Sequence, residues 1–321
     1  MMDIMKNLNG KMVAVTGASG YIGSALTEAL QKCSAHVIRV SRSELSPKSG
    51  MLDVQADICA LSCWQDIVSR AEVIFHLAGN TSIYTAIKDP VESLNSTLLP
   101  INHLIAAAQK TGKTPRVVFA STATVYGLTD DLPVSEIQES NPITLYDLHK
   151  RFAEEQLALA SQLGVLQSVS LRLANVYGPS LNASSAADRG VLNKVSKMAL
   201  QQKDLQLFGD GRYIRDYVYI DDVVNAFLCA GASDKFTGHF FNVASGQGVT
   251  LEEAFQQVVE YSEKITGQKV GINKASWPEN ADAIEFRNFV GDVHSLKDAF
   301  NWQPEVSLSS GIQQMLMAFS K

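Results

Sequence analysis

The stretch Met12–Gly23 reads MVAVTGASGYIG and decides the expected fold. Its first five residues form a short apolar run typical of a buried β-strand, and a helical pattern follows over Tyr21–Cys33. Of the glycines in this stretch, Gly17 permits a tight turn, Gly20 lets a pyrophosphate approach the backbone, and Gly23 lets the helix pack closely on the strand. The pattern predicts a phosphate loop at a helix N-terminus, with an ordinary strand–helix turn as the alternative.

Short apolar runs and longer helical patterns continue to alternate through the first half of the chain. Val- and Ile-rich strands separated by helices are typical of a parallel sheet covered on both faces. About six strands are expected, so the sequence predicts an α/β fold with a Rossmann-type, doubly wound parallel sheet. The further strands are expected at His36–Ser41, Val73–Leu77, Val117–Ala120 and Val169–Leu173, and the further helices at Ser93–Lys110 and Tyr146–Leu163.

The character of the sequence changes after Pro179, where a Ser/Ala/Asn-rich loop spans Leu181–Arg189. A helix to Gln202, a strand or turn leading into a helix over Val218–Ala230, and helices over Thr250–Thr266 and Gly311–Phe319 are expected after it. In the third of these helices, Thr250 and Glu253 have the spacing of a capping box. We expect a dinucleotide-binding domain of residues 1–177 with about 213–245, and a smaller, interleaved α/β substrate-binding domain of residues 178–212 and 246–321.

Composition excludes several classes of protein. A chain of 321 residues that is 46% hydrophobic is an ordinary packed globule, and its net charge of −6 argues against a protein that coats nucleic acid. No run is long and apolar enough to span a membrane, and the polar start lacks the core of a signal peptide, which favours the cytoplasm. Cys59 and Cys63 lack a partner pair, so no metal site is expected.

The end of the second predicted strand bears on the choice of cofactor. A site for NAD usually has an acid there to bind the ribose hydroxyls, but this chain has Ser41 and Arg42, with no acid before Glu44. A hydroxyl and a guanidinium suit a 2′-phosphate and favour NADP over NAD, unless Arg42 is simply a solvated surface residue. Asp57 and Ile58, after a presumed third strand, are placed to cover the adenine, although Asp57 could equally cap a helix.

Two further patterns predict acid–base chemistry. Tyr146 and Lys150 are four residues apart and therefore share one face of the expected helix. An ammonium beside a phenol favours the phenolate, which can then take a proton from an alcohol while a nicotinamide takes the hydride. The run ASTATVYG at Ala120–Gly127 places hydroxyls, Thr122 among them, at the carboxyl end of a buried strand, where ligands bind in open α/β sheets.

Several ordered motifs together resemble the extended short-chain dehydrogenase/reductase superfamily, in its nucleotide-sugar epimerase and dehydratase branch. The similarity covers nearly the whole chain. The motifs are TGASGYIG, HLAG at His76–Gly79, STATVYG at Ser121–Gly127, YDLHK at Tyr146–Lys150, LRLANVYGP at Leu171–Pro179, FGDG at Phe208–Gly211 and RDYVYIDD at Arg215–Asp222.

The resemblance implies a role for each matching residue. Tyr146 would be the base, Lys150 would modulate it and bind the ribose, and Thr122 would be the hydroxyl partner of the reacting oxygen. Arg172 and Asp216 are expected instead to be members of structural ion pairs. The residues implied to contact the diphosphate-linked substrate are Asn175, Arg215 and Arg287, with Thr122. The further residues implied to bind the cofactor are Ser19, Tyr21, Ile22, Leu77, Ala78 and Gly79.

Two departures from the family pattern affect the expected reaction. The 4,6-dehydratases carry an acidic pair just after the catalytic hydroxyl, whereas Ala123 and Thr124 stand here as they do in 4-epimerases. The pair Ser41–Arg42, where those epimerases keep an acid, instead favours reductases and other enzymes that use NADP. This conflict stays open in the sequence.

The leading hypothesis is an NAD(P)-dependent nucleotide-sugar epimerase that acts through a transient keto-sugar and reversible hydride transfer. The alternatives are an NADPH-dependent reductase of keto-sugars and, from another class, a non-catalytic dinucleotide-binding sensor. The sequence names neither the sugar nor the nucleotide. The expected partners are a nucleotide-linked sugar and a second copy of the chain, through helices Ser93–Lys110 and Tyr146–Leu163, but no nucleic acid and no membrane.

Overall fold

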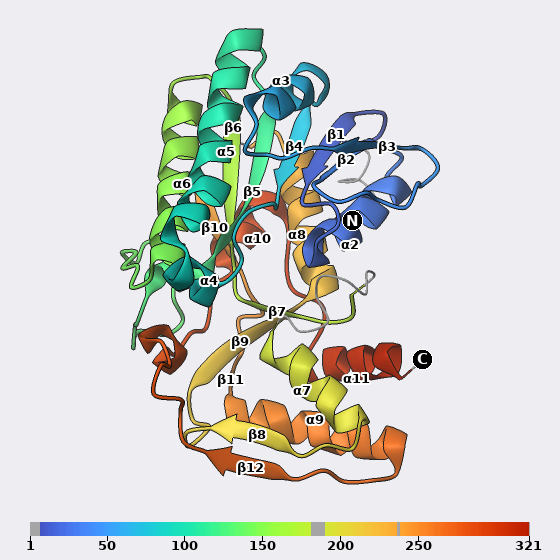
Figure 1. Ribbon diagram of the computed structural model, residues 1–321, viewed down its shortest axis with the longest axis vertical. Helices are drawn as coiled ribbons and strands as arrows, with labels where there is room; N and C mark the ends of the chain where they lie inside the picture. Colours follow the sequence, from blue (N-terminus) through green and yellow to red (C-terminus); the bar gives the residue numbers. More distant parts are fainter. Residues whose placement is uncertain (1–6, 181–189, 236–237, 321) are drawn as a thin grey trace.

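A seven-stranded parallel sheet dominates the computed structural model, which describes residues 7–180, 190–235 and 238–320 (Figure 1). The strands lie in the order β10-β6-β5-β4-β1-β2-β3, so the chain starts in the middle, winds to one edge and then returns to the other. Strands β1 and β4 flank the point where the winding reverses. The bounds are β1 Met12–Thr16, β2 His36–Ser41, β3 Met51–Gln55, β4 Val73–His76, β5 Arg116–Thr122, β6 Gln167–Leu173 and β10 Phe240–Val243.

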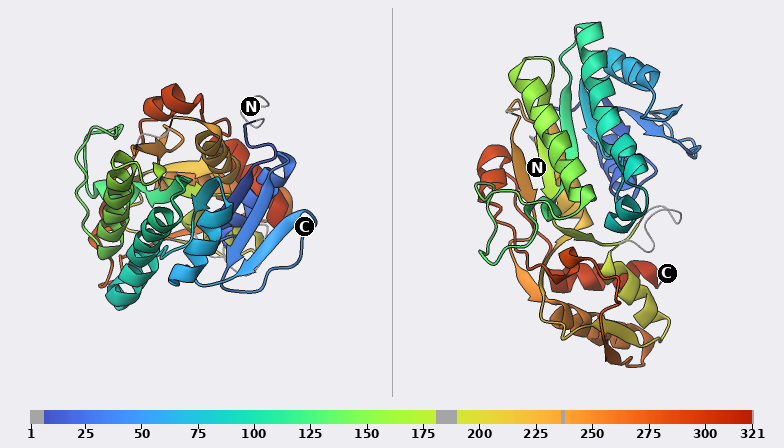
Figure 2. Two further views of the ribbon diagram at one scale, coloured as in Figure 1. Left: turned by 90° about the horizontal axis from the view of Figure 1, so that it is seen from above. Right: turned by 60° about the vertical axis from the view of Figure 1, so that its left-hand side comes forward.

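Helices cover both faces of this sheet because side chains alternate along each strand (Figure 2). In β1, Val13 and Val15 belong to one buried cluster and Ala14 to another. The Val13 side packs against α2 (Tyr21–Lys32) and α8 (Ile220–Ala232). The opposite side packs against three helices, α3 Leu61–Arg70, α5 Pro90–Thr111 and α6 Leu145–Gln162.

The predicted doubly wound α/β fold is confirmed, with one more strand than expected. The predicted helices Ser93–Lys110 and Tyr146–Leu163 correspond to α5 and α6, and their bounds differ by a few residues at most. The strand that the sequence did not reveal is β10, which pairs with β6 at the edge of the sheet. Its four residues are Phe-Phe-Asn-Val, too short and too mixed to stand out as a buried strand.

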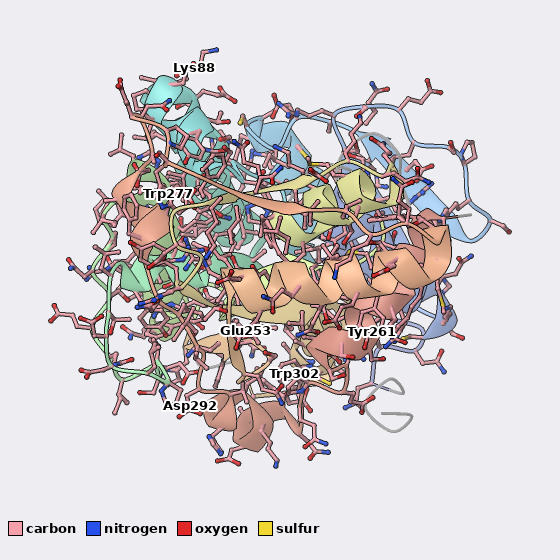
Figure 3. All side chains as sticks on the ribbon, turned by 90° about the horizontal axis from the view of Figure 1, so that it is seen from below. Lys88, Glu253, Tyr261, Trp277, Asp292 and Trp302 are labelled. Atoms are coloured by element: carbon pink, nitrogen blue, oxygen red, sulfur yellow. The ribbon has the colours of Figure 1, made fainter. Side chains whose placement is uncertain are left out.

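A smaller region lies below the large sheet in Figure 1 and contains two further sheets. One has the order β11-β9-β7 and the other pairs β12 with β8. The capping box at Thr250 is confirmed: its side chain accepts from the Glu253 amide, and the Glu253 carboxylate accepts from the Thr250 amide (Glu253 is labelled in Figure 3). The bounds are β7 Asn175–Tyr177, α7 Val191–Leu200, β8 Leu205–Phe208, β9 Ile214–Tyr219, β11 Gly248–Thr250, α9 Leu251–Thr266, β12 Ile272–Ala275 and α11 Leu308–Phe319.

Short elements connect the two regions, and the predicted domain boundaries stay a prediction. Within the 213–245 segment, β10 joins the large sheet, whereas β9 pairs with β7 and β11 outside it. The predicted loop Leu181–Arg189 lies outside the described residues. No helix in the described ranges has the length and apolar character to cross a membrane. The remaining elements are α4 Ile83–Lys88, η1 Ala123–Tyr126, η2 Ala283–Phe286 and α10 His294–Phe300.

Candidate active site

The glycine loop after β1 leaves the N-terminus of α2 open. Gly17 has φ +70°, and a Cβ there would lie 2.9 Å from the Ala78 amide nitrogen, so only glycine fits this turn. A Cβ at Gly23 would lie 2.1 Å from the Gly17 carbonyl oxygen; the close approach is thus to the loop itself rather than to the strand. Gly20 is the N-cap of α2, and no side chain caps the helix there. This geometry fits a diphosphate bound by backbone amides.

The other predicted residues of the loop hold its shape. Tyr21 is buried and donates from Oη to the Gly178 carbonyl at 2.8 Å, so its phenol ties α2 to the chain near Pro179. Ile22 packs against the core on the same face of the sheet. Ser19 accepts a 3.0 Å hydrogen bond from the buried Ser41 hydroxyl, which connects the glycine loop to the end of β2.

At the end of β2, Arg42 is exposed and no carboxylate of the described residues lies within ion-pair distance of it. Ser41 also accepts from the Ser43 amide at 3.2 Å. Asp57 is exposed, and its carboxylate accepts from the Cys59 amide at 2.9 Å, so it closes a turn ahead of α3 and is not the residue that caps the helix. Ile58 beside it is buried. The side chains near the predicted ribose site therefore offer a hydroxyl and a guanidinium.

Residues 76–79, which form the HLAG motif, lie against the glycine loop, where the winding of the sheet reverses between β1 and β4. The Thr16 Oγ1 and the His76 Nδ1 are 2.7 Å apart, and Thr16 Oγ1 also accepts from the Ala78 amide at 3.3 Å. Burial lowers the pKa of His76 to about 3, with the nearby Lys150 ammonium as a second cause, so this imidazole is neutral. Leu77, Ala78 and Gly79 are half-buried, and Gly79 has φ +146°, a conformation that side chains rarely adopt.

Lys150 is a buried cation one helical turn after the candidate base on α6. Its Nζ donates to the Ala120 carbonyl at 2.8 Å and lies 4.7 Å from the centre of the Phe119 ring. Burial lowers its pKa to about 8, although the Glu154 carboxylate opposes that change. Tyr146 is half-buried, one turn earlier on α6. An ammonium held here favours the phenolate of Tyr146.

The structure separates the hydroxyls of Ser121, Thr122 and Thr124, which lie at the end of β5 and just beyond it. Ser121 is buried and donates to the Glu154 carboxylate, away from the other two. Thr122 and Thr124 have their Oγ1 atoms 2.8 Å apart, and Thr124 in turn donates to the carboxylate of Asp147. The sequence singled out Thr122 but missed Thr124 and Asp147 as its partners. Asp147 stands inside the YDLHK motif, and its spacing from Thr144 is the only signal that pointed to a buried, hydrogen-bonded acid.

The predicted substrate residues come together although they lie far apart in the sequence. Arg287 donates to the Asn175 side-chain oxygen at 3.3 Å. Arg215 is buried and donates to the backbone carbonyls of Arg287 and Glu285, the latter at 2.7 Å, so it holds the segment that carries Arg287. Burial first, and then Arg287, lower the pKa of Arg215 to about 10. Two neighbouring guanidinium groups without a carboxylate in ion-pair contact, among the described residues, suit an anionic ligand.

Two residues left out of the predicted site have structural roles. Arg172 forms a buried ion pair with Glu154 at 2.6 Å, as expected, and packs over the Phe240 ring. The expected ion pair of Asp216 is not found among the described residues. Its carboxylate instead accepts hydrogen bonds from the amides of Ser245, Gly246 and Gly291, because it faces a turn of the backbone.

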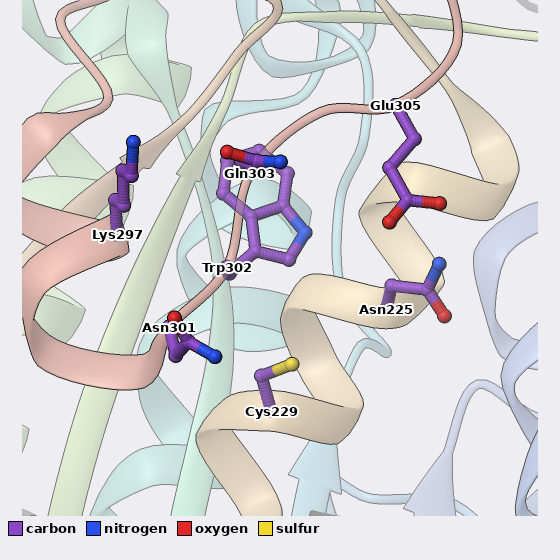
Figure 4. Close-up of a pocket in the computed structure, with 7 residues that line it drawn as sticks. All are labelled: Asn225, Cys229, Lys297, Asn301, Trp302, Gln303 and Glu305. Carbon is purple, nitrogen blue, oxygen red and sulfur yellow. The ribbon is translucent and has the colours of Figure 1, made fainter. Parts of the chain in front are cut away.

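A separate hollow lies between α8 and the segment after α10 (Figure 4). Asn225 and Cys229 of α8 line it, together with Lys297 and residues 301–303 and 305. The Trp302 indole nitrogen donates to the Asp222 carbonyl at 3.0 Å, which holds this segment on α8. None of the predicted catalytic, cofactor or substrate residues lines this hollow, so the candidate site lies elsewhere.

Comparison with known proteins places the chain in a family. Residues 13–244 match the model of the NAD dependent epimerase/dehydratase family. The chain belongs to this family. The resemblance found in the sequence motifs is therefore confirmed, and the matched residues include the glycine loop, Thr122, Tyr146 and Lys150.

Relatives within the family match almost the whole chain. The UDP-glucose 4-epimerase of Mycolicibacterium smegmatis is 29% identical over an alignment of 315 positions, gaps included, that covers 95% of this chain and 97% of that protein. The UDP-N-acetyl-alpha-D-glucosaminuronate decarboxylase of Bacillus cytotoxicus is 28% identical over an alignment of 325 positions, gaps included, that covers 96% of this chain and 98% of that protein.

Solved structures of UDP-glucose 4-epimerases are similar to this chain over almost its whole length. The UDP-glucose 4-epimerase of Thermotoga maritima with UDP-glucose has a TM-score of 0.84 at 28% identity, with 96% and 98% of the two chains covered. The UDP-glucose 4-epimerase of Thermus thermophilus in complex with NAD has a TM-score of 0.83 at 27% identity, with 96% and 99% covered.

Proposed function

We propose that the chain is an NAD(P)-dependent nucleotide-sugar 4-epimerase that acts on a UDP-sugar. The observation that carries the proposal is the meeting of two sets of residues. Thr122, at the end of β5, is paired in register with Leu173 of β6, and Asn175, two residues beyond Leu173, accepts a hydrogen bond from Arg287. The acid–base residues and the cationic pair that suits a diphosphate thus belong to one site. The names of the relatives that match the whole chain support the choice of reaction and nucleotide.

The protein's own residues would perform the proton chemistry. A bound nicotinamide cofactor would accept a hydride from the sugar and return it to the other face. Lys150, held by the Ala120 carbonyl, favours the phenolate of Tyr146, which takes the proton of the reacting hydroxyl and gives it back. Thr122 contacts the reacting oxygen from the end of β5, and Asn175, Arg215 and Arg287 hold the diphosphate.

A preference for NADP over NAD is a second part of the proposal. The exposed Arg42 and the Ser41 hydroxyl leave a 2′-phosphate without a repelling acid at the end of β2. The relative from Thermus thermophilus is described with NAD, so the two cofactors have to be compared on this chain itself. Calorimetric titration of both cofactors decides the matter, because tighter binding of NAD contradicts the preference.

The homodimer and the cytoplasmic location stay predictions. Exposed apolar side chains on the two helices named for the dimer, Val91 and Leu94 of α5 and Phe152 and Leu159 of α6, support a shared interface. Sedimentation of the purified protein tests it: a monomer at micromolar concentration contradicts the dimer.

A screen of UDP-sugars tests the reaction, with mass spectrometry and the absorbance of reduced nicotinamide as readouts. A product of unchanged mass that separates from the substrate, with no net change of the cofactor, is the expected result. A gain of two hydrogens with loss of reduced cofactor would identify a reductase instead. Cofactor binding without turnover of any sugar would favour the sensor.

A further inference from the structure

A fully buried carboxylate follows the candidate base in the sequence. Asp147 has no exposed surface, and it follows Tyr146 in the first turn of α6. Thr144, the N-cap of this helix, accepts from the Asp147 amide at 3.2 Å and donates to its Oδ2 at 2.7 Å. A helix cap needs only this exchange with Thr144. The second carboxylate oxygen, Oδ1, accepts from Thr124, which the cap does not require.

Thr122, Thr124 and Asp147 thus form a row of hydrogen bonds. Each hydroxyl has a single proton to donate, and this fixes the direction of the hydrogen bonds along the row. Thr124 donates its proton to Asp147, so at its 2.8 Å contact with Thr122 it must accept the proton of Thr122. Thr122 also accepts from the Thr124 amide at 3.2 Å. What Thr122 offers to a ligand is therefore its remaining lone pair. A reacting hydroxyl that meets Thr122 donates to it, and the row then runs without a break from that hydroxyl to the carboxylate.

The surroundings of Asp147 make it a better base than an exposed carboxylate, because burial outweighs the groups that stabilise its charge. The N-terminus of α6 and the guanidinium of Arg287 stabilise the charge, as do the hydroxyls of Thr124 and Thr144. Burial is the largest influence and raises the pKa of Asp147 above its ordinary value, and the Asp282 carboxylate acts in the same direction. A raised pKa means that the carboxylate holds a transferred proton more firmly.

We propose that Thr122, Thr124 and Asp147 form a second proton path for the reacting hydroxyl, beside Tyr146. This inference rests on the proposed epimerase function. As the hydride leaves the sugar carbon for the nicotinamide, the O–H bond of the sugar breaks and its proton goes to Thr122. The proton of Thr122 passes to Thr124, and that of Thr124 to Oδ1 of Asp147. When the hydride returns, each proton moves back, so the row is restored after every turnover.

The test measures turnover in a Tyr146→Phe background, where only the second path remains. This variant should keep turnover above that of heat-inactivated protein. Adding Asp147→Asn or Thr124→Val should lower the remaining rate at least about tenfold, since positioned acid–base groups contribute about 10²–10⁴-fold. Adding Thr124→Ser, which keeps a hydroxyl, should largely preserve it. Asp89→Asn is the matched control, because Asp89 is an exposed aspartate at the N-cap of α5.

A spectroscopic titration separates the proton path from a purely structural role. The infrared difference between the cofactor-free wild type and Asp147→Asn should show a protonated carboxyl band that grows as the pH falls, since the other carboxyl groups are common to both proteins. In the Tyr146→Phe background, turnover should fall with decreasing pH at the midpoint of that band. A helix cap alone predicts no such agreement. Melting temperatures of all variants verify that they are folded.

Three results would overturn the path: no turnover at all in Tyr146→Phe, an unchanged rate on adding Asp147→Asn, or kinetic and infrared midpoints that differ. Loss of the rate in Thr124→Ser as well as in Thr124→Val would also contradict it. Failure of the proposed function looks different, because the wild-type protein itself would then epimerise no UDP-sugar. In that case the path is refuted together with the function, whereas an active wild type confines a failure to the path.

Discussion

Replacing Lys150 with methionine should make the protein more stable and nearly inactive. The fall in pKa from 10.5 to about 8 means that burial makes the charged form less favourable than an exposed one by about 3 kcal/mol. Methionine keeps the apolar length of the side chain but leaves the Ala120 carbonyl without its donor, which costs about 1–2 kcal/mol. The net gain in the free energy of unfolding at neutral pH is therefore about 1–2 kcal/mol. Turnover should fall by about 10²-fold or more, because no cation then favours the phenolate of Tyr146.

The pH dependence of stability shows whether the buried ammonium of Lys150 stabilises or destabilises the folded protein. Between pH 8 and 10.5, the unfolded chain keeps a proton on Lys150 that the folded protein has lost. Stability contributed by this group therefore rises with pH across that window, by up to about 3 kcal/mol. Below pH 8 both states are protonated, and the full destabilisation is present. The advantage of Lys150→Met over the wild type should shrink as the pH rises through this window and reverse near its middle.

Urea unfolding of the cofactor-free protein at several pH values measures this difference. Lys110→Met is the matched control, since Lys110 is an exposed lysine in the last turn of α5 and its loss should leave both stability and pH dependence unchanged. If Lys150→Met were less stable than the wild type at neutral pH, the buried ammonium would be stabilising and the argument from its desolvation would be refuted. A pH-independent difference would refute it as well.

Three further predictions concern the other parts of the site. Tyr146→Phe should lower turnover by about 10²–10⁴-fold while dinucleotide affinity, followed by calorimetry, stays within a few-fold; a wild-type rate would exclude Tyr146 as the base. Gly23→Ala should abolish dinucleotide binding in a folded protein, because the added carbon would meet the Gly17 carbonyl at 2.1 Å, and unchanged affinity would show that the loop binds no phosphate. Arg42→Ala should weaken the binding of NADP about ten- to a hundredfold and that of NAD little, and Ser41→Asp with Arg42→Ala should reverse the preference; tighter binding of NAD by the wild type, unchanged in Arg42→Ala, would place Arg42 in solvent.

Features encoded by neighbouring residues could be predicted from the sequence. The positive φ at Gly17, the open N-terminus of α2 and the capping box at Thr250 are local features of the backbone, and each has a fixed spacing. The face shared by Tyr146 and Lys150 follows from the helix repeat. Features that depend on tertiary packing could not be predicted. Strand β10 is a strand because β6 offers it an edge, and its four residues do not show this on their own.

The hydroxyls after β5 show where sequence reasoning stops. Alternation along a strand puts Ser121 and Thr122 on opposite faces, so their separation could have been predicted once the strand was known to reach Thr122. Thr124 follows in a turn of 3₁₀ helix, where that rule no longer holds. Its contact with Asp147 depends on how α6 docks against that turn, and no spacing between residues 124 and 147 encodes such docking. The carboxylate closest in sequence to the candidate base was therefore visible in the motif, but its connection to Thr122 required the fold.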